Sequence, residues 1–193
     1  MNFYISDLHL GHEKALIFDD RPFSSIEEQN LMMIRKWNKV VTQDDTVFIL
    51  GDFSLFDQDG MLFLNNTKGR KVLIIGNHDK SANILMGFDD VHDYLEIKDG
   101  GTDVILSHYP IAHWKKADYG SIHLYGHIHR SRDSIDFEKY VYSMRNRINE
   151  TTGRKLPYNA YNVGCMMPYM NYTPRTISEI IQGDKKYYEE QFR

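Results

Sequence analysis

The stretch TVFILGD, residues 46–52, carries the pattern on which the fold prediction rests. Its first five residues are apolar or β-branched and favour a buried β-strand. Gly51 then allows a sharp turn of the backbone, and Asp52 places a short carboxylate directly at the end of the strand. We therefore expect a buried strand that presents Asp52 to a functional site.

Other apolar runs along the chain end in the same way, each followed at once by polar side chains. The runs are residues 2–6, 71–75, 102–107 and 122–125, and the fragments after them are Asp7-Leu8-His9, Gly76-Asn77-His78-Asp79, His108 and Gly126-His127-Ile128-His129. Strands that end at a common edge bring together side chains from distant parts of the chain. Asn162-Val163-Gly164 is a weaker fragment of the same kind.

Helical patterns lie between the first of these strands. Ser25-Ile26-Glu27-Glu28 matches a capping box, and the apolar residues that follow at helical spacing are Leu31, Ile34, Trp37, Val40 and Val41. Met61, Leu62 and Leu64 indicate a second, shorter helix before the strand at 71–75. The first eighty residues therefore alternate strand and helix, the pattern that builds a parallel sheet.

The alternation fades in the second half of the chain. Residues 91–97, 102–107 and 122–125 favour strands separated by loops, so we expect a second sheet. The polar stretch 130–157 has no clean period, and two interpretations stay open: a solvated loop or small hairpin, or a flap that contacts substrate. A short helix that ends near Gly183 is expected within residues 176–193.

The composition is typical of a globular protein, and its 193 residues fit a single domain, residues 1–193. No apolar run approaches the ~20 residues that cross a bilayer, so no membrane association is expected. A formal charge of −4 gives no general attraction to nucleic acid, so no stable nucleic-acid complex is expected. The single cysteine, Cys165, and the lack of a basic leader before Asp7 indicate a cytoplasmic protein, whose oligomeric state is left open.

The polar fragments contain the residue types that bind a pair of divalent cations. Cleavage of a phosphate ester by two metal ions requires a carboxylate that bridges them, and Asp52 is the candidate. Asp7 and His9 stand at positions i and i+2, which share one side of an extended segment. His127 and His129 repeat this spacing after another strand. Oxygen and imidazole ligands without a thiolate suit two divalent ions of Mn, Fe or Zn.

The fragment Gly76-Asn77-His78-Asp79 supplies both a ligand and a candidate acid. The neutral amide oxygen of Asn77 can coordinate a cation without adding charge. His78 would then face the substrate and protonate the leaving oxygen. We expect Asp79 to accept a hydrogen bond from the His78 imidazole and fix its orientation.

Three further side chains are candidates for substrate binding. His12 and His113 could each line the substrate pocket or lie in a surface loop. Arg130, just beyond His129, could neutralise a phosphate oxygen by a forked contact.

The ordered set Asp7-x-His9, Gly51-Asp52, Gly76-Asn77-His78-Asp79, His108 and Gly126-His127-x-His129 resembles the calcineurin-like metallophosphoesterase superfamily. The resemblance spans residues 7–129 and implies an α/β fold, a four-layer α/β/β/α sandwich with two central mixed sheets. It implies one ion held by Asp7, His9, Asp52 and His129, and a second held by Asp52, Asn77, His108 and His127. Ile75 and Asp79 depart from the Arg-Gly-Asn-His-Glu motif of the protein phosphatases. The small size is similar to the compact bacterial and phage phosphodiesterases of the superfamily.

The leading hypothesis is therefore a phosphodiesterase that acts on a phosphate-ester small molecule or a nucleotide. A hydroxide activated by the two metals would attack phosphorus, and His78 would protonate the departing alkoxide. A phosphomonoesterase or nucleotide pyrophosphatase would use the same site. A pseudoenzyme scaffold that binds proteins is the alternative from another class, although such a protein is expected to have lost metal ligands.

Overall fold

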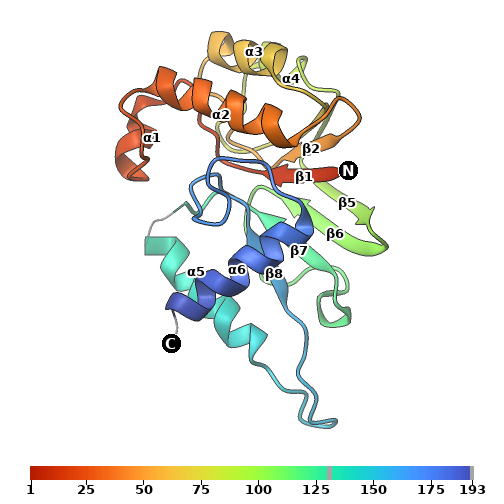
Figure 1. The fold of residues 1–193 in the computed structure, drawn as a ribbon. Coiled ribbons are helices and arrows are strands. Elements are labelled where there is room, and N and C mark those ends of the chain that lie inside the picture. Colours follow the sequence, from red (N-terminus) through yellow and green to blue (C-terminus); the bar gives the residue numbers. More distant parts are fainter. Residues whose placement is uncertain (130–131, 192–193) are drawn as a thin grey trace.

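Two four-stranded sheets form the centre of the computed structural model, which describes residues 1–129 and 132–191 (Figure 1). The first sheet has the order β1-β2-β3-β4, and its strands are Asn2–Ile5, Thr46–Ile49, Arg70–Ile74 and Asp90–His92. The second has the order β5-β6-β7-β8, and its strands are Tyr94–Asp99, Thr102–Ser107, Ile122–Tyr125 and Asn159–Asn162. The mixed α/β class and the second sheet are thus confirmed.

The strand directions differ between the two sheets. In the first sheet every ladder pair is parallel, with Ile5 opposite Ile49 and Ile49 opposite Leu73. The expectation of a mixed sheet is therefore wrong for this sheet, because helices connect its first strands and return the chain in the same direction. In the second sheet β5 and β6 are antiparallel, whereas β6, β7 and β8 run parallel.

Ser6 joins the two sheets at the edge where the polar fragments lie. Its N–H donates to the carbonyl of Val163 at 2.9 Å, and its carbonyl accepts from the N–H of Cys165 at 2.8 Å. The Ser6 hydroxyl donates to the carbonyl of Leu50 at 2.6 Å. The carboxyl ends of β1, β2 and β8 therefore meet around one buried residue.

Helices lie along both sheets (Figure 1). Those drawn on the side of the first sheet are α2 (Ile26–Val40), α3 (Asp57–Asn66) and α4 (Ala82–Leu85), whereas α1 (Glu13–Phe18) lies apart from the strands at the left of the view. Those drawn beside the second are α5 (Arg132–Arg145) and α6 (Ile177–Gln191). A 3₁₀ turn, η1 (Ala117–Tyr119), precedes β7. None of the helices in the described part of the chain is both long and apolar enough to cross a membrane.

Helix α2 begins where the capping pattern predicts, and it buries most of the predicted apolar face. The Ser25 hydroxyl accepts from the N–H of Glu28 at 3.2 Å, whereas the Glu28 carboxylate accepts from Ser24 instead of closing the box on Ser25. Leu31 is half exposed, and Met33 and Trp37 fill the core. The apolar spacing thus located the helix and most of its packed face, since Trp37 and Val41 are buried and Ile34 and Val40 pack against the core. Leu31 is the exception, and the burial of Gln29, Asn30 and Met33 was not expected.

The stretch 130–157 contains helix α5, which neither sequence interpretation predicted. Val141 of this helix is fully buried, and Phe137 and Met144 pack against the same core cluster. The exposed residues between them hide this helical spacing in the sequence. Arg145 ends the helix and donates to Asp184 of α6 at 2.7 Å. A small hairpin does follow, closed by a bridge between Ile148 and Lys155.

Helix α6 continues through Gly183 instead of ending there. A Cβ at this position would overlap the side chain of Tyr169. Gly183 therefore allows a close approach of the helix to Tyr169 and does not stop the helix.

His123 is a fully buried residue of β7 whose ring contacts backbone groups at both nitrogens. Its Nε2 accepts from the N–H of Ile111 at 3.0 Å, and its Nδ1 lies 3.3 Å from the carbonyl oxygen of Ile105. Burial lowers the pKa of His123 to about 4, so the ring is neutral in the folded chain at neutral pH.

This burial predicts a pH dependence of stability that His123→Gln removes. The unfolded chain protonates this ring near pH 6.5 and the folded chain only near pH 4, so stability is present above pH 6.5 and lost as the pH falls. Wild type should lose about 2 to 3 kcal/mol more than His123→Gln between pH 7 and pH 4.5 in urea unfolding. His113→Gln, which removes an exposed histidine, should behave like wild type; equal pH slopes for wild type and His123→Gln would contradict the prediction.

Candidate metal centre

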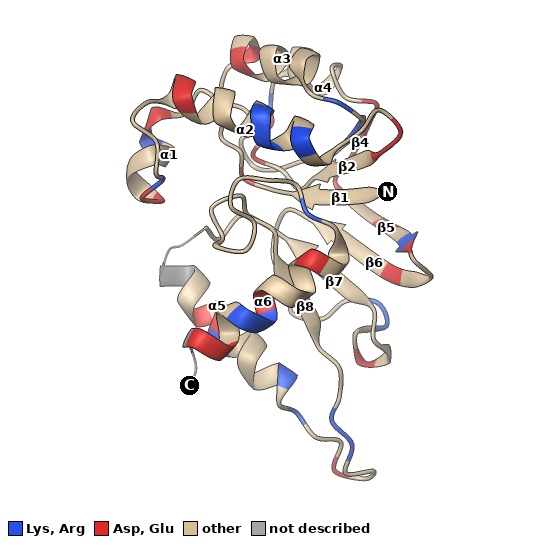
Figure 2. Ribbon diagram, viewed as in Figure 1, with Lys and Arg blue, Asp and Glu red and all other residues tan. Residues whose placement is uncertain are grey.

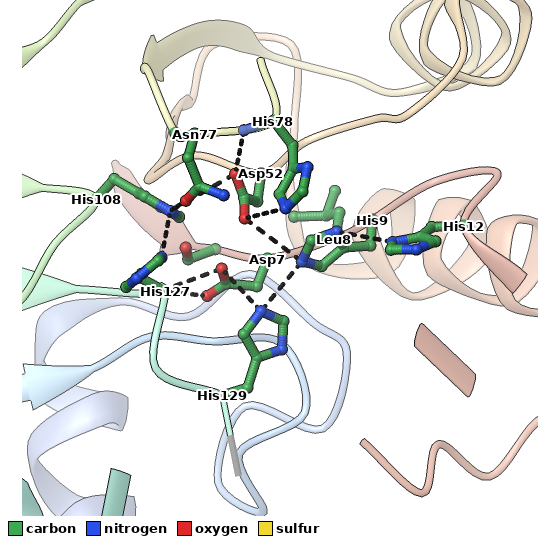
Figure 3. Close-up of polar contacts among 12 residues, drawn as sticks. Asp7, Leu8, His9, His12, Asp52, Asn77, His78, His108, His127 and His129 are labelled. Atoms are coloured by element: carbon green, nitrogen blue, oxygen red, sulfur yellow. Dashed lines mark hydrogen bonds and ion pairs between the residues drawn. The ribbon is translucent and has the colours of Figure 1, made fainter. Parts of the chain in front are cut away.

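The polar fragments converge at the carboxyl ends of the strands, as the sequence predicts (Figure 3). Neighbouring loops are joined by backbone hydrogen bonds. The N–H groups of Asp7 and His9 donate to the carbonyls of Gly51 and Asp52, both at 3.0 Å. The N–H of His127 donates to the carboxylate of Asp7 at 3.1 Å. Three segments of the chain are thereby fixed against each other.

The ligand candidates share an uncommon backbone conformation. Positive φ angles occur at Asp7 (57°), His9 (50°), Asp52 (51°), His127 (72°) and His129 (43°). The i, i+2 pairs therefore come together through left-handed turns, and the expectation of an extended segment is wrong. Such positions cost about 1–3 kcal/mol each for residues other than glycine, and they concentrate at functional sites.

Two groups of side chains could each hold a metal ion. In the first group Asp7, His9, Asp52 and His129 each offer a ligand atom within 4.8 Å of the others. Asp52, His108 and His127 form the second group at the same spacing. Asp52 belongs to both groups, with Oδ2 at 3.6 Å from His9 Nε2 and Oδ1 at 3.5 Å from His108 Nε2.

Asn77 joins the second group through its amide oxygen, which lies 3.0 Å from Nε2 of His108. Nδ1 of His108 lies 2.8 Å from the carbonyl of Leu50, which can only accept, so this nitrogen carries a proton. Where this is the only proton of the ring, Nε2 presents a lone pair toward the Asn77 oxygen, which is also an acceptor. A cation between the two would satisfy both, so the donor set fits a metal.

Burial shapes the electrostatics of the first group. It lowers the pKa of His9, with the nearby His129 acting in the same direction, and it raises the pKa of Asp7, partly offset by His129. Burial alone would lower the pKa of His129, but the hydrogen bond with Asp19 and the charge of Asp7 raise it. A bound cation would stabilise buried carboxylates that lie beside imidazole nitrogens in this way.

Sequence reasoning missed Asp19 and Arg21, which lie directly behind the first group. Nδ1 of His129 lies 3.0 Å from both Asp19 oxygens. Arg21 donates to Asp19 through Nε and Nη2, at 2.9 and 2.7 Å. Asp19 does not follow a strand, so the pattern that located the ligands gives no sign of it. The adjacent charges in Asp19-Asp20-Arg21 were the available signal.

His78 lies over the cluster with its side chain 44% exposed. Its Nε2 is 3.9 Å from Oδ2 of Asp52, and its backbone N–H donates to Oδ1 at 2.9 Å. The expected bond from the His78 ring to Asp79 is wrong. Asp79 accepts instead from the N–H groups of Asp52, Phe53 and Gly76, at 2.8 to 2.9 Å. Asp79 thus fastens the loops after β2 and β3, because its buried oxygens satisfy three backbone donors.

The substrate-binding candidates separate in the structure. His12 lies beside the first group, with Nδ1 3.4 Å from Nδ1 of His9 and its ring close to those of His78 and Phe18. His113 is exposed in the loop before η1, and within the described chain no hydrogen bond or ring contact joins it to the cluster. Arg130 lies outside the described residues.

The weak fragment Asn162-Val163-Gly164 packs beneath the site. The Asn162 side-chain oxygen accepts from the N–H of Gly164 at 2.8 Å. Cys165 is fully buried, and its thiol donates to the carbonyl of Asp7 at 3.1 Å. Burial raises the pKa of Cys165 to about 12, so this thiol supports the Asp7 loop and is not reactive.

A cavity of about 700 Å³ lies elsewhere, between α5, α6 and the segment 155–161. Tyrosines line its walls, and none of the cluster residues borders it. Lys and Arg are drawn on α2, on α6 and along the segment after α5 (Figure 2). The metal-site geometry, and not cavity size or clustered positive charge, therefore identifies the candidate centre.

Comparison with known proteins finds relatives in phages and in an archaeon. The chain is 33% identical over 162 residues to the Gene 66 protein of Mycobacterium phage L5, covering 65% of this chain and 76% of the relative. It is 33% identical over 156 residues to the Gene 66 protein of Mycobacterium phage D29, covering 65% and 77%. It is 31% identical over 150 residues to the uncharacterized protein MJ1445 of Methanocaldococcus jannaschii, covering 76% and 78%.

Among solved structures, the protein of unknown function AQ665 from Aquifex aeolicus matches with a TM-score of 0.69. The match covers 94% of this chain and 98% of the other, at 24% sequence identity. At this identity the match shows a shared fold. No protein-family model matches the sequence.

Gly126 gives a direct test of the centre, because a Cβ there would overlap Oγ of Ser6 and lie 2.5 Å from Oδ2 of Asp7. Gly126→Ala should displace Asp7, reduce Mn²⁺ affinity at least about 10-fold and lower stability by about 1–3 kcal/mol. Titration calorimetry and thermal unfolding measure both effects. Gly60→Ala is the control, since its Cβ contacts begin at 3.2 Å. Unchanged Mn²⁺ binding by Gly126→Ala would show that Asp7 is not a ligand.

Proposed function

We propose that this chain, which belongs to the family of the Gene 66 proteins of mycobacteriophages L5 and D29, is a metal-dependent phosphoesterase that hydrolyses phosphodiesters. The position of Asp52 carries the proposal. One of its oxygens faces His9 and the other faces His108, so a single carboxylate serves both ligand groups. A carboxylate shared between two cations is the central element of two-metal phosphate-ester hydrolysis.

The proposed cofactor is a pair of divalent ions, Mn, Fe or Zn. Asp7, His9, Asp52 and His129 would hold one ion, and Asp52, Asn77, His108 and His127 would hold the other. The mixture of carboxylate, amide and imidazole ligands supports these metals. Membership of the calcineurin-like superfamily, with its four-layer α/β/β/α sandwich, is part of the proposal, supported by helices beside both sheets. A single domain and a cytoplasmic location remain predictions.

Divalent ions held by these ligands would supply Lewis acidity toward the phosphate and a nucleophile from water near neutral pH. Asp52 holds the two ligand groups at a fixed separation. His78 lies on the solvent side of Asp52, so its exposed imidazole can reach the leaving oxygen of a bound ester and donate a proton. Asp79 and Arg21 act on backbone groups of the loops and keep the ligands in position.

The acid role predicts the behaviour of His78→Ala. This variant should keep its metal, since no ligand is lost. Its turnover of diesters with an alkoxide leaving group should fall about 10²- to 10⁴-fold, and turnover of bis(4-nitrophenyl) phosphate should fall less, because 4-nitrophenolate leaves without protonation. Metal analysis and steady-state rates measure the two effects, with His92→Ala as the matched histidine control. Full activity of His78→Ala on alkyl esters would show that His78 is not the general acid.

Diester preference is the second prediction for this site. The guanidinium of Arg21 lies against the cluster but donates to protein oxygens, so it is not free to neutralise the additional charge of a monoester dianion. We expect kcat/KM for bis(4-nitrophenyl) phosphate to exceed that for 4-nitrophenyl phosphate by about tenfold or more, a difference of about 1.4 kcal/mol. The reverse preference would favour the phosphomonoesterase. Purified protein that holds only trace metal after incubation with Mn²⁺ would favour the scaffold.

A further inference from the structure

A buried ion pair between Asp19 and Arg21 lies behind the first ligand group. The inference drawn from it rests on the metal centre proposed above. Asp19 directly follows α1 as its C-cap residue, and its side chain is fully buried. Both of its oxygens lie 3.0 Å from Nδ1 of His129. An ionised carboxylate can only accept, so Nδ1 of His129 must carry a proton and donate it. In the neutral ring Nε2 is then the nitrogen left to bind an ion.

The position of Nε2 agrees with this assignment. It faces the first group, 3.6 Å from Oδ1 of Asp7 and 3.1 Å from Nε2 of His9 (Figure 3). A hydrogen bond from a carboxylate to the opposite ring nitrogen fixes the tautomer and the orientation of a metal-binding histidine. Asp19 thus aims His129 at the place where Asp7, His9 and Asp52 converge.

Arg21 connects the same carboxylate to the backbone of the Asp7 loop. Its Nη2 donates to the carbonyl of Asp7 at 2.9 Å and to Asp19 at 2.7 Å. Its Nη1 donates to the carbonyl of Leu8 at 2.9 Å and to the amide oxygen of Gln29 at 3.0 Å. The two carbonyls lie between the left-handed positions Asp7 and His9, so one planar guanidinium holds the strained turn together.

We propose that Asp19 and Arg21 are positioning residues that build the first metal position before an ion arrives, so that this position is loaded first. Asp19 fixes the ring of His129, and Arg21 fixes both Asp19 and the turn that carries Asp7 and His9. Arranged ligands do not have to be ordered when the ion binds, which favours affinity. This position also has two carboxylates, Asp7 and Asp52, and therefore the stronger attraction for a cation.

The second metal position is supported differently. His108 is oriented by the carbonyl of Leu50, which is a neutral backbone group. Asn77 contributes no charge, and Asp52 is the single carboxylate of this group. No contact in the described structure joins Asp19 or Arg21 to Asn77, His108 or His127. Loss of Asp19 should therefore weaken one position and leave the other nearly unchanged.

Calorimetric titration of the metal-free full-length chain with Mn²⁺ tests the proposal, and Asp19→Asn is the variant. Asn is similar in size to Asp but lacks the charge that pairs with Arg21. Wild type should bind in two phases of different affinity, and the tighter phase should weaken about 10- to 100-fold in Asp19→Asn while the weaker one changes little. Asp20→Asn is the matched control: it removes a neighbouring, exposed carboxylate and keeps a residue that tolerates φ of 49°.

The outcomes separate this proposal from the function itself. A wild-type protein that binds no Mn²⁺ would remove the metal centre and the proposed function together. Two bound ions with unchanged affinities in Asp19→Asn, or equal weakening of both, would overturn the positioning role alone. If Asp19→Asn does not fold, nitrogen NMR of the zinc-loaded wild type tests the proposal by showing which ring nitrogen of His129 carries the proton. The His129 ring should carry its proton on Nδ1, and a proton on Nε2 would refute the proposal.

Discussion

Left-handed backbone at the ligand positions is the constraint on which this site depends. Five such residues, at about 1–3 kcal/mol each, represent a cost comparable to the whole stability of a typical domain. The turns persist because their peptide groups are held from outside. Gly51 and Asp52 accept from the Asp7 loop, and Arg21 donates to the carbonyls of Asp7 and Leu8. In return, the side chains of residues at positions i and i+2, such as Asp7 and His9, can both face the same candidate metal position.

Asp79 and Arg21, which have side chains of opposite charge, both hold the backbone of the loops that carry the candidate ligands. Asp79 is an acceptor placed among backbone N–H groups of the loops after β2 and β3. Arg21 is a donor placed among backbone carbonyls of the loop after β1. Each is buried and each satisfies several backbone groups at once, so removal of either would leave buried polar groups without partners. The precision of the ligands therefore depends on charged residues that bind no metal.

Much of the fold could be predicted from the sequence because its strands are short, apolar and buried. The runs that end at Asp7, Asp52 and His108 have this character, and the structure places strands there within one or two residues. Local sequence could not show which of two sheets a strand would join. Residues 91–97, expected as one strand, are divided between β4 in the first sheet and β5 in the second. Tertiary contacts decide this division.

The candidate site was predictable only where it follows the strand-end pattern. All seven proposed ligands follow that pattern, and the structure brings them together. Asp19 stands 110 residues before the histidine that it contacts, at the end of a six-residue helix that the sequence did not indicate. Asp79 was found, but its partner was not, because adjacency to His78 suggested a contact that the turn does not make.

The separation of His78 from Asp79 changes how the proposed acid would be oriented. Among the described residues no carboxylate is hydrogen-bonded to the His78 ring, and Oδ2 of Asp52 lies 3.9 Å from its Nε2. That oxygen also faces His9 in the first ligand group, so coordination of a cation would withdraw it from His78. A substrate phosphate is then the remaining acceptor on the exposed side. If His78 is the acid, as proposed, the bound ester would order its ring, and the acid step would be coupled to substrate binding.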